Sequence, residues 1–145
     1  MSRVDIKNVW KIYEGDVQAV QDLNFFIEDG EFLAVLGPSG CGKSTTLRMI
    51  AGLEDITRGE ILFDGKVINN LSPSQRNLAL AFESYALYAR LSVRENIAFP
   101  MRAKGISKAE AHKKVMWIAN ILNVADILEK KPGSLSGGHK QRVNL

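Results

Sequence analysis

The 145 residues are 46% apolar and 24% charged, and they carry a formal net charge of +3 at pH 7. These fractions are typical of a globular domain, and the scattered positive residues argue against nucleic acid as a partner. No apolar run approaches the length of about 18 residues that a membrane helix needs. The single cysteine, Cys41, excludes an internal disulfide and fits a reducing compartment such as the cytoplasm.

Alternating apolar residues predict strands in the first part of the chain. Residues 4–12 and 17–27 form the first two, and Asp29 with Gly30 should turn the chain into a third. That third strand, residues 31–36, is a continuous apolar run, which is typical of a strand buried on both faces of a parallel sheet. Residues 59–67 predict a hairpin around Asp64-Gly65, and residues 78–82 predict a second core strand.

The most informative stretch follows the third predicted strand and fits the phosphate-loop spacing G-x-x-x-x-G-K-[ST]. Its glycines let the backbone N–H groups point at an anion, and a helix over residues 45–51, ending at Gly52, adds its N-terminal amides. Lys43 brings a positive charge to the β- and γ-phosphates, Ser44 can place its hydroxyl on Mg²⁺, and Thr45 can bond an α-phosphate. A glycine-rich turn without a ligand is the alternative. The predicted nucleotide-binding residues are Gly37, Pro38, Ser39, Gly40, Cys41, Gly42, Lys43, Ser44 and Thr45.

The pattern changes to helices after about residue 84. Ser92 and Glu95 form a capping box that opens a helix running toward Gly105, which Pro100 can break. A second box begins at Ser107, and the apolar residues after it share one helical face. That face consists of Ala111, Val115, Ile118, Ala119 and Leu122, whereas His112 is read as a solvated histidine and Trp117 as packing or surface cover.

A second motif lies near the end of the chain, Leu135-Ser136-Gly137-Gly138-His139, followed by Lys140-Gln141-Arg142-Val143. Together with the phosphate loop it resembles the ATP-binding subunits of ABC transporters, whose signature is L-S-G-G-Q followed by x-Q-R-V. Residues 48–54, 84–88 and 95–97 resemble the branch that imports maltose, other oligosaccharides and glycerol phosphate. The resemblance covers essentially the whole chain. It implies an α/β fold: a P-loop NTPase core with an N-terminal antiparallel β subdomain and an α-helical subdomain.

The resemblance also implies roles for individual residues. Tyr13 matches the aromatic residue that stacks on adenine, with an ordinary core aromatic as the alternative. The signature, Leu135, Ser136, Gly137, Gly138 and His139, would complete the ATP site of the opposite subunit. Residues 85–88, which contain Tyr85 and Tyr88, match the segment that meets the membrane permease, with a buried aromatic pair as the alternative.

Two positions depart from the family's pattern. Glu83 stands where the family has a glutamine that senses Mg²⁺ and the attacking water, and His139 stands where glutamine closes the signature. A carboxylate can ligate Mg²⁺ but adds negative charge beside the γ-phosphate. With Lys43, Glu83 is the candidate catalytic residue that the resemblance implies.

The implied protein is an ATPase that binds ATP and Mg²⁺, pairs with a second ATPase subunit, identical or different, and acts on a permease at the inner face of the cell membrane. The expected divisions are residues 1–84, 85–135 and 136–145. The family's strand ending in Asp-Glu and its switch histidine do not occur in this sequence, so we expect the C-terminal half of the core to be missing and the chain alone to be inactive. The alternatives are a non-hydrolysing nucleotide-binding or dimerisation fragment and a soluble ABC-type ATPase.

Overall fold

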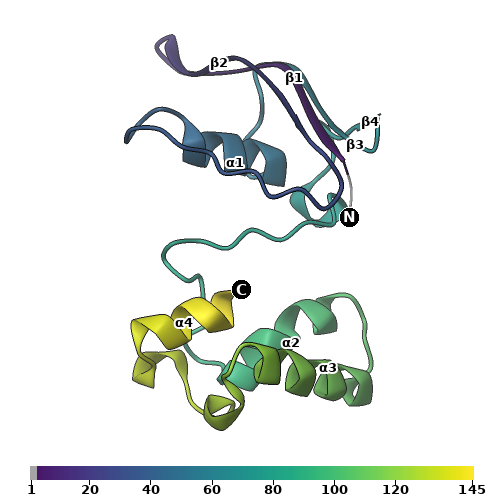
Figure 1. The fold of residues 1–145 in the computed structure, drawn as a ribbon, viewed down its shortest axis with the longest axis vertical. Helices are drawn as coiled ribbons and strands as arrows, with labels where there is room; N and C mark the ends of the chain where they lie inside the picture. The colour runs from purple at the N-terminus through teal and green to yellow at the C-terminus, as the bar shows by residue number, and fades with distance from the viewer. Residues whose placement is uncertain (1–2) are drawn as a thin grey trace. The chain divides into compact units, whose positions relative to one another are not determined.

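The computed structural model describes residues 3–145, which form two compact units that meet in sequence between Leu80 and Ala81. The first unit contains an antiparallel sheet and helix α1, and the second contains α2, α3 and α4 (Figure 1). The sheet has the strand order β2-β1-β3-β4. Its strands are β1 (Val4–Tyr13), β2 (Val17–Ile27), β3 (Arg58–Phe63) and β4 (Lys66–Val67).

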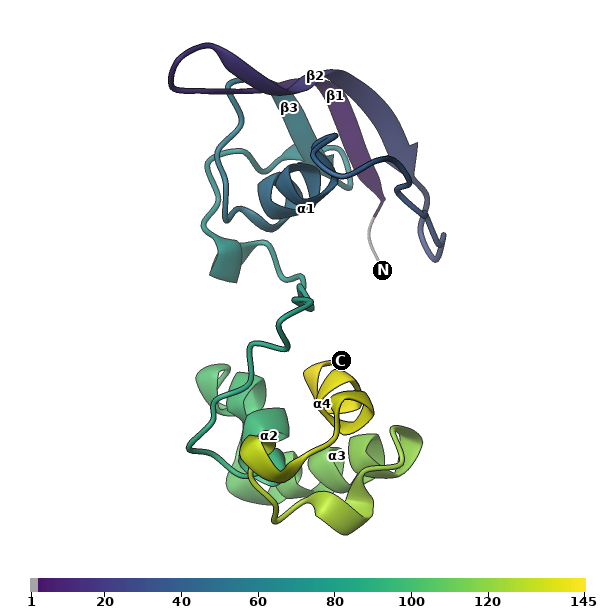
Figure 2. The same ribbon diagram turned by 90° about the vertical axis from the view of Figure 1, so that its left-hand side faces the viewer.

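Helix α1 (Lys43–Ala51) lies against one face of this sheet (Figure 2). Met49 of the helix is buried against Ile6 and Val9 of β1 and Ile61 of β3, each 2% exposed or less. Strand β1 lies between β2 and β3, so Ile6 pairs with Phe25 on one side and with Ile61 on the other. Apolar burial of this kind is the main force that holds the helix on the sheet.

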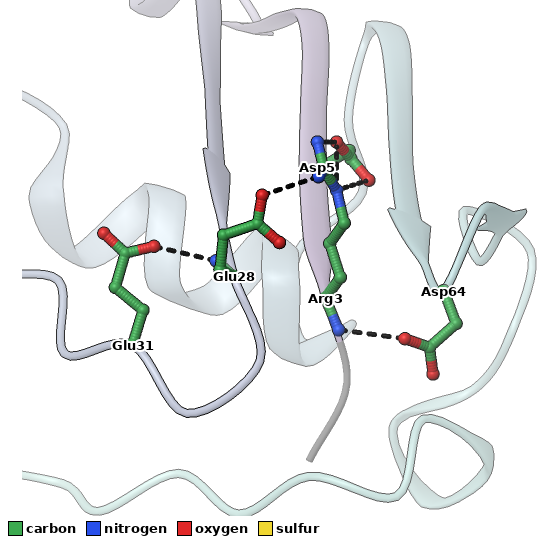
Figure 3. A network of polar contacts seen from close by, with 5 residues as sticks. All are labelled: Arg3, Asp5, Glu28, Glu31 and Asp64. Atoms are coloured by element: carbon green, nitrogen blue, oxygen red, sulfur yellow. Dashed lines mark hydrogen bonds and ion pairs between the residues drawn. The ribbon is translucent and has the colours of Figure 1, made fainter.

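A polar network fastens the end of the sheet at which β1 begins (Figure 3). The Arg3 guanidinium binds both carboxylate oxygens of Asp5 and donates at 2.7 Å to Glu28, while the Arg3 amide donates to Asp64. Glu31 accepts from the Glu28 amide at 2.7 Å. The network therefore links the start of β1 to the chain after β2 and to the β3–β4 turn.

Both strands predicted for a parallel core are wrong. Residues 31–36 and 78–82 adopt no regular secondary structure, although Asp29 and Gly30 form the expected turn. Phe32 is 92% exposed and Leu36 is 88% exposed. A central strand needs a hydrogen-bonding neighbour on each side, and among residues 3–145 no strand pairs with either segment. Without partners, the backbone amides and carbonyls of these segments are better satisfied by water.

The second unit is helical, as the sequence predicts. Its helices are α2 (Val93–Ala103), α3 (Lys108–Ile121) and α4 (Gly137–Asn144), joined by short 3₁₀ turns at Ala125–Ile127 and Pro132–Ser134. Ser92 and Glu95 form the predicted capping box, and the Ser107 hydroxyl accepts the Glu110 amide. Pro100 does not end α2, which continues to Ala103.

The core of this unit combines the predicted face of α3 with residues from the other helices and turns. Val115 and Ala119 of α3 are buried, whereas Trp117 on the same helix is 66% exposed and so serves as surface cover. His112 is exposed. The buried cluster consists of Val93, Ala98, Val115, Ala119, Val124, Ile127, Leu128, Leu135 and Val143.

Candidate functional site

The phosphate-loop residues lead directly into α1, which begins at Lys43. Gly42 caps the helix in the left-handed region at φ 92°, which favours glycine. A Cβ on Gly42 would lie 2.5 Å from the carbonyl oxygen of Ala19 in β2, so glycine is also required by the close approach of the strand. The loop is thus held against the sheet through its last glycine.

The Lys43 ammonium lies over its own loop. It donates to the carbonyl oxygens of Gly37 at 2.8 Å and Pro38 at 2.6 Å, and it lies 3.6 Å from Sγ of Cys41. These acceptors are neutral, so a phosphate oxygen can compete for the same ammonium with full negative charge. Cys41 is an exposed free thiol at this position.

A concavity of about 280 Å³ lies at the N-terminus of α1. No side chain caps the helix and its first turn contains no acidic residue, so the partial positive charge of the helix end faces the concavity. These features fit an anion such as a phosphate group. The lining residues are Ala19, Ser39, Gly40, Gly42, Lys43, Ser44 and Thr45.

Tyr13 lies at the end of β1, on the same hairpin as the strand that contacts the loop. It pairs with Val17 at the start of β2, and Ala19 follows two residues later, about 7 Å further along the strand. Tyr13 is 38% exposed and is therefore not the core aromatic of the alternative reading. The hairpin brings the aromatic ring and the phosphate loop into one unit.

The signature residues form the start of α4 in the second unit. Leu135 is buried in the helical core, and the Ser136 hydroxyl caps α4 by accepting the His139 amide at 3.3 Å. The same hydroxyl lies 3.0 Å from Nδ1 of His139. Gly137 and Gly138 are exposed, and a Cβ on Gly137 would lie 3.7 Å from the hydroxyl oxygen of Tyr85.

The remaining candidates lie before α2 in the second unit. Glu83 is exposed, whereas Ser44, the other candidate magnesium ligand, belongs to the first unit. Tyr85 adopts a positive φ of 64°. Tyr88 is 51% exposed and its ring centroid lies 4.4 Å from that of Phe99 in α2, so it does not form a buried pair with Tyr85.

Within residues 3–145, no three histidine, cysteine or acidic side chains gather closely enough to hold a metal ion. In the same part of the chain, every helix is too short or too polar to cross a bilayer.

Comparison with known protein families shows to which family the chain belongs. The family described as ABC transporter matches residues 20–145, which include both the phosphate loop and the signature. The chain belongs to the ABC transporter family. The fold agrees, because the chain matches the ATP-binding cassette MJ0796, solved as a dimer in a post-hydrolysis state with ADP and Pi, with a TM-score of 0.87 and 32% identity. That match covers 97% of this chain and 66% of the other.

Curated members of the ABC transporter family are similar along the entire chain. The sn-glycerol-3-phosphate import ATP-binding protein UgpC of Cupriavidus necator is 50% identical over 145 residues. The maltose/maltodextrin import ATP-binding protein MalK of Yersinia pestis is 49% identical over the same length. The chain spans 40% of the former and 39% of the latter.

Sequence reasoning missed the residues that surround these ABC motifs. Ala19 lines the concavity at the N-terminus of α1, and Arg76 donates to the carbonyls of Met49 and Ile50 at the far end of the helix. Lys11 lies over the ring of Tyr13. Of these contacts, only that of Lys11 with Tyr13 could have been predicted from the sequence, because residues two apart in a strand share a face.

Proposed function

We propose that this chain supplies the ATP-binding elements of an ABC importer subunit, which couples ATP binding and hydrolysis to uptake of a sugar or a related solute. The observation that carries the proposal is the uncapped N-terminus of α1 behind a glycine loop, in a chain that also contains the signature serine. The class of solute rests on the relatives, whose names specify import of sn-glycerol-3-phosphate and of maltose or maltodextrin.

In the proposed site, the Lys43 ammonium leaves the carbonyls of Gly37 and Pro38 and binds the β- and γ-phosphates. The first-turn amides of α1 receive the phosphate oxygens, and Thr45 hydrogen-bonds the α-phosphate. Tyr13 stacks on adenine at the end of the hairpin. Each of these groups belongs to the first unit, so one unit holds the whole nucleotide.

The Ser44 hydroxyl and the Glu83 carboxylate would hold Mg²⁺. When bound, the ion neutralises phosphate charge and polarises the γ-phosphate. Ser44 lies beside Lys43 at the start of α1, and its short neutral side chain is suited to an oxygen ligand of Mg²⁺. Glu83 brings a negative charge to a position where the family has a neutral glutamine, and we propose that it acts as a ligand there and as a sensor of the attacking water.

The proposed partners are a second ATPase chain, identical or different, and a membrane permease. The signature residues, Leu135 to His139, would face the γ-phosphate held by Lys43 of the second chain. Residues 85–88 would contact the permease, which would hold the subunit at the inner face of the membrane. The exposure of Tyr88 and of Gly137 and Gly138 supports these assignments, because these residues are accessible to another molecule.

A polypeptide of residues 1–145 is expected to bind MgATP without steady turnover. A positioned general base commonly contributes a factor of about 10²–10⁴ to a rate, and the Asp-Glu strand that supplies it in the family does not occur in this sequence. Phosphate release measured under saturating MgATP tests this expectation. Steady release by the wild-type polypeptide that Lys43→Ala abolishes would contradict it.

The binding proposal is tested by titrating MgATP into wild type, Lys43→Ala and the control Lys66→Ala. Lys66 is an exposed residue of β4, so the control removes the same charge away from the loop. Loss of the Lys43 ammonium should weaken binding by about 1.5–3 kcal/mol. Equal affinities for wild type and Lys43→Ala would overturn the assignment of the phosphate loop.

A further inference from the structure

Lys11 makes an unusual set of contacts for a surface lysine. Its ammonium lies 4.8 Å from the ring centroid of Tyr13, 2.6 Å from a carboxylate oxygen of Glu54 and 2.8 Å from the carbonyl oxygen of Asp55. The Lys11 side chain is only 12% exposed and that of Glu54 only 24% exposed. The ammonium is therefore held in one place between the ring and the segment that follows α1.

The two residues that anchor the Lys11 ammonium lie in the segment between α1 and β3. Glu54 and Asp55 follow Gly52, the glycine that ends α1, and precede β3. The hydrogen bond from Lys11, with a further contribution from Tyr13, holds the pKa of the Glu54 carboxyl below its usual value, so the acid is charged at neutral pH. The ionised Glu54 carboxylate and the Asp55 carbonyl both accept hydrogen bonds from the Lys11 ammonium and so fix its position.

A cation fixed over an aromatic ring restrains that ring. The attraction between an ammonium and the ring quadrupole is about 0.5–1 kcal/mol at an exposed site and more when the pair is desolvated. Here the cation lies over the Tyr13 ring, and Tyr13 as a residue is 38% exposed. The ring is thus held from one side and remains accessible to a ligand.

We propose that Lys11, anchored by Glu54 and the Asp55 carbonyl, is a positioning residue that pre-orders the ring of Tyr13 for stacking against a purine base. The inference rests on the proposed function, in which Tyr13 stacks on adenine and the phosphates bind at α1. Lys11 contacts no part of the nucleotide. It acts by removing rotamer freedom from Tyr13 before the base arrives, which lowers the entropy lost on binding.

A simpler role for Lys11 would be to fasten β1 to the segment after α1. That role would affect the stability of the unit, and through it the binding of every phosphate ligand alike. The positioning role instead predicts an effect on affinity only for ligands that contain a base. Comparing MgATP with magnesium tripolyphosphate separates the two roles, since both ligands use the phosphate loop and only one uses the ring.

The test titrates both ligands into the chain of residues 1–145 carrying Lys11→Met, Lys11→Arg or the control Lys66→Met. Lys11→Met should weaken MgATP binding about threefold to tenfold, the range expected from ordering one side chain on binding, and leave tripolyphosphate binding unchanged. Lys11→Arg keeps a cation over the ring and should bind MgATP within about twofold of wild type. Lys66→Met should match wild type for both ligands.

A double-mutant cycle with Tyr13→Leu completes the test. In the Tyr13→Leu background, Lys11→Met should cause no further loss of MgATP affinity, because the ring on which it acts is gone. Equal weakening of MgATP and tripolyphosphate by Lys11→Met, or an undiminished loss in the Tyr13→Leu background, would overturn the positioning role and leave the proposed function intact. If Lys43→Ala instead binds both ligands as tightly as wild type does, the proposed function is overturned, and the inference with it.

Discussion

The hydroxyl oxygen of Ser136 accepts the backbone amide of His139 and also lies 3.0 Å from Nδ1 of the same residue. One serine oxygen therefore serves as the N-cap of α4 and as the partner of an imidazole. Ser136 is the second residue of the ABC signature, directly after Leu135. We propose that it meets the γ-phosphate held by a second subunit. Its side chain is already engaged within its own helix, so capping and ligand binding draw on the same oxygen.

Replacing this serine should destabilise the helical unit. Ser136→Ala removes the cap and should lower the free energy of unfolding of that unit by about 0.5–2 kcal/mol, whereas Ser136→Gly should cost only a few tenths. Urea unfolding followed by far-UV circular dichroism measures the difference. If Ser136→Ala leaves the free energy of unfolding unchanged, the capping bond seen in the structure does not contribute to stability.

The two ABC motifs should act across chains. Lys43→Ala chains and Ser136→Arg chains should each fail to associate in MgATP, because each homodimer would contain only damaged sites, while their mixture keeps one site with both elements intact. Analytical ultracentrifugation in the presence of MgATP measures the association, with circular dichroism to verify that each variant is folded. A mixture that stays monomeric while wild type dimerises would rule out the arrangement in trans.

Gly52 should tolerate alanine less well than Gly65 does. Both glycines have a φ of 74°, so alanine suffers the same backbone strain at each. A Cβ on Gly52 would lie 2.6 Å from Nε of Arg76, a buried guanidinium that donates to the Met49 and Ile50 carbonyls, whereas a Cβ on Gly65 meets nothing within 4 Å. The excess loss in Gly52→Ala, measured by thermal unfolding, therefore reports the Arg76 contact. Equal losses would show that Arg76 moves aside freely.

Acid should destabilise both units. The hydrogen bond from Arg3 lowers the pKa of the Asp5 carboxyl from its usual value, and the bond from the Ser92 backbone amide lowers that of the Glu95 carboxyl. Because the folded-state pKa is the lower one, the stability that each group contributes is complete above its unfolded pKa and is lost as the pH falls through its folded pKa. The melting temperature should thus fall below about pH 4. Asp5→Asn and Glu95→Gln should each flatten that dependence, and an unchanged pH profile in both variants would contradict the assignment.

Truncation of two aliphatic residues of the first unit should change its stability by very different amounts. Ile61→Ala should cost about 2–5 kcal/mol, because Ile61 is 1% exposed and packs in the cluster around Met49. Leu36→Ala should change the free energy of unfolding by no more than about 0.5 kcal/mol, because Leu36 is 88% exposed. Denaturant unfolding of the 145-residue chain decides this. A large loss in Leu36→Ala would mean that residues 31–36 are buried in solution.

The sequence by itself determined the features that depend on neighbours along the chain. These features are the start of α1 directly after the glycine-rich loop, the glycine that ends α1, the hairpin at Asp64-Gly65 and the cap at Ser92. Each requires only a few residues at set spacings, so each could be predicted without a fold. The family could be inferred for the same reason, since both of its motifs are short and contiguous.

Only the tertiary structure decided the features that need a distant partner. Residues 31–36 read as a core strand but remain irregular, because a strand exists through hydrogen bonds to its neighbours and not through its own composition. In the same way, Ala19 reaches Gly42, and Lys11 reaches Glu54, only after the sheet and α1 have packed together. Local spacing encodes the phosphate loop, while packing decides which side chains surround it.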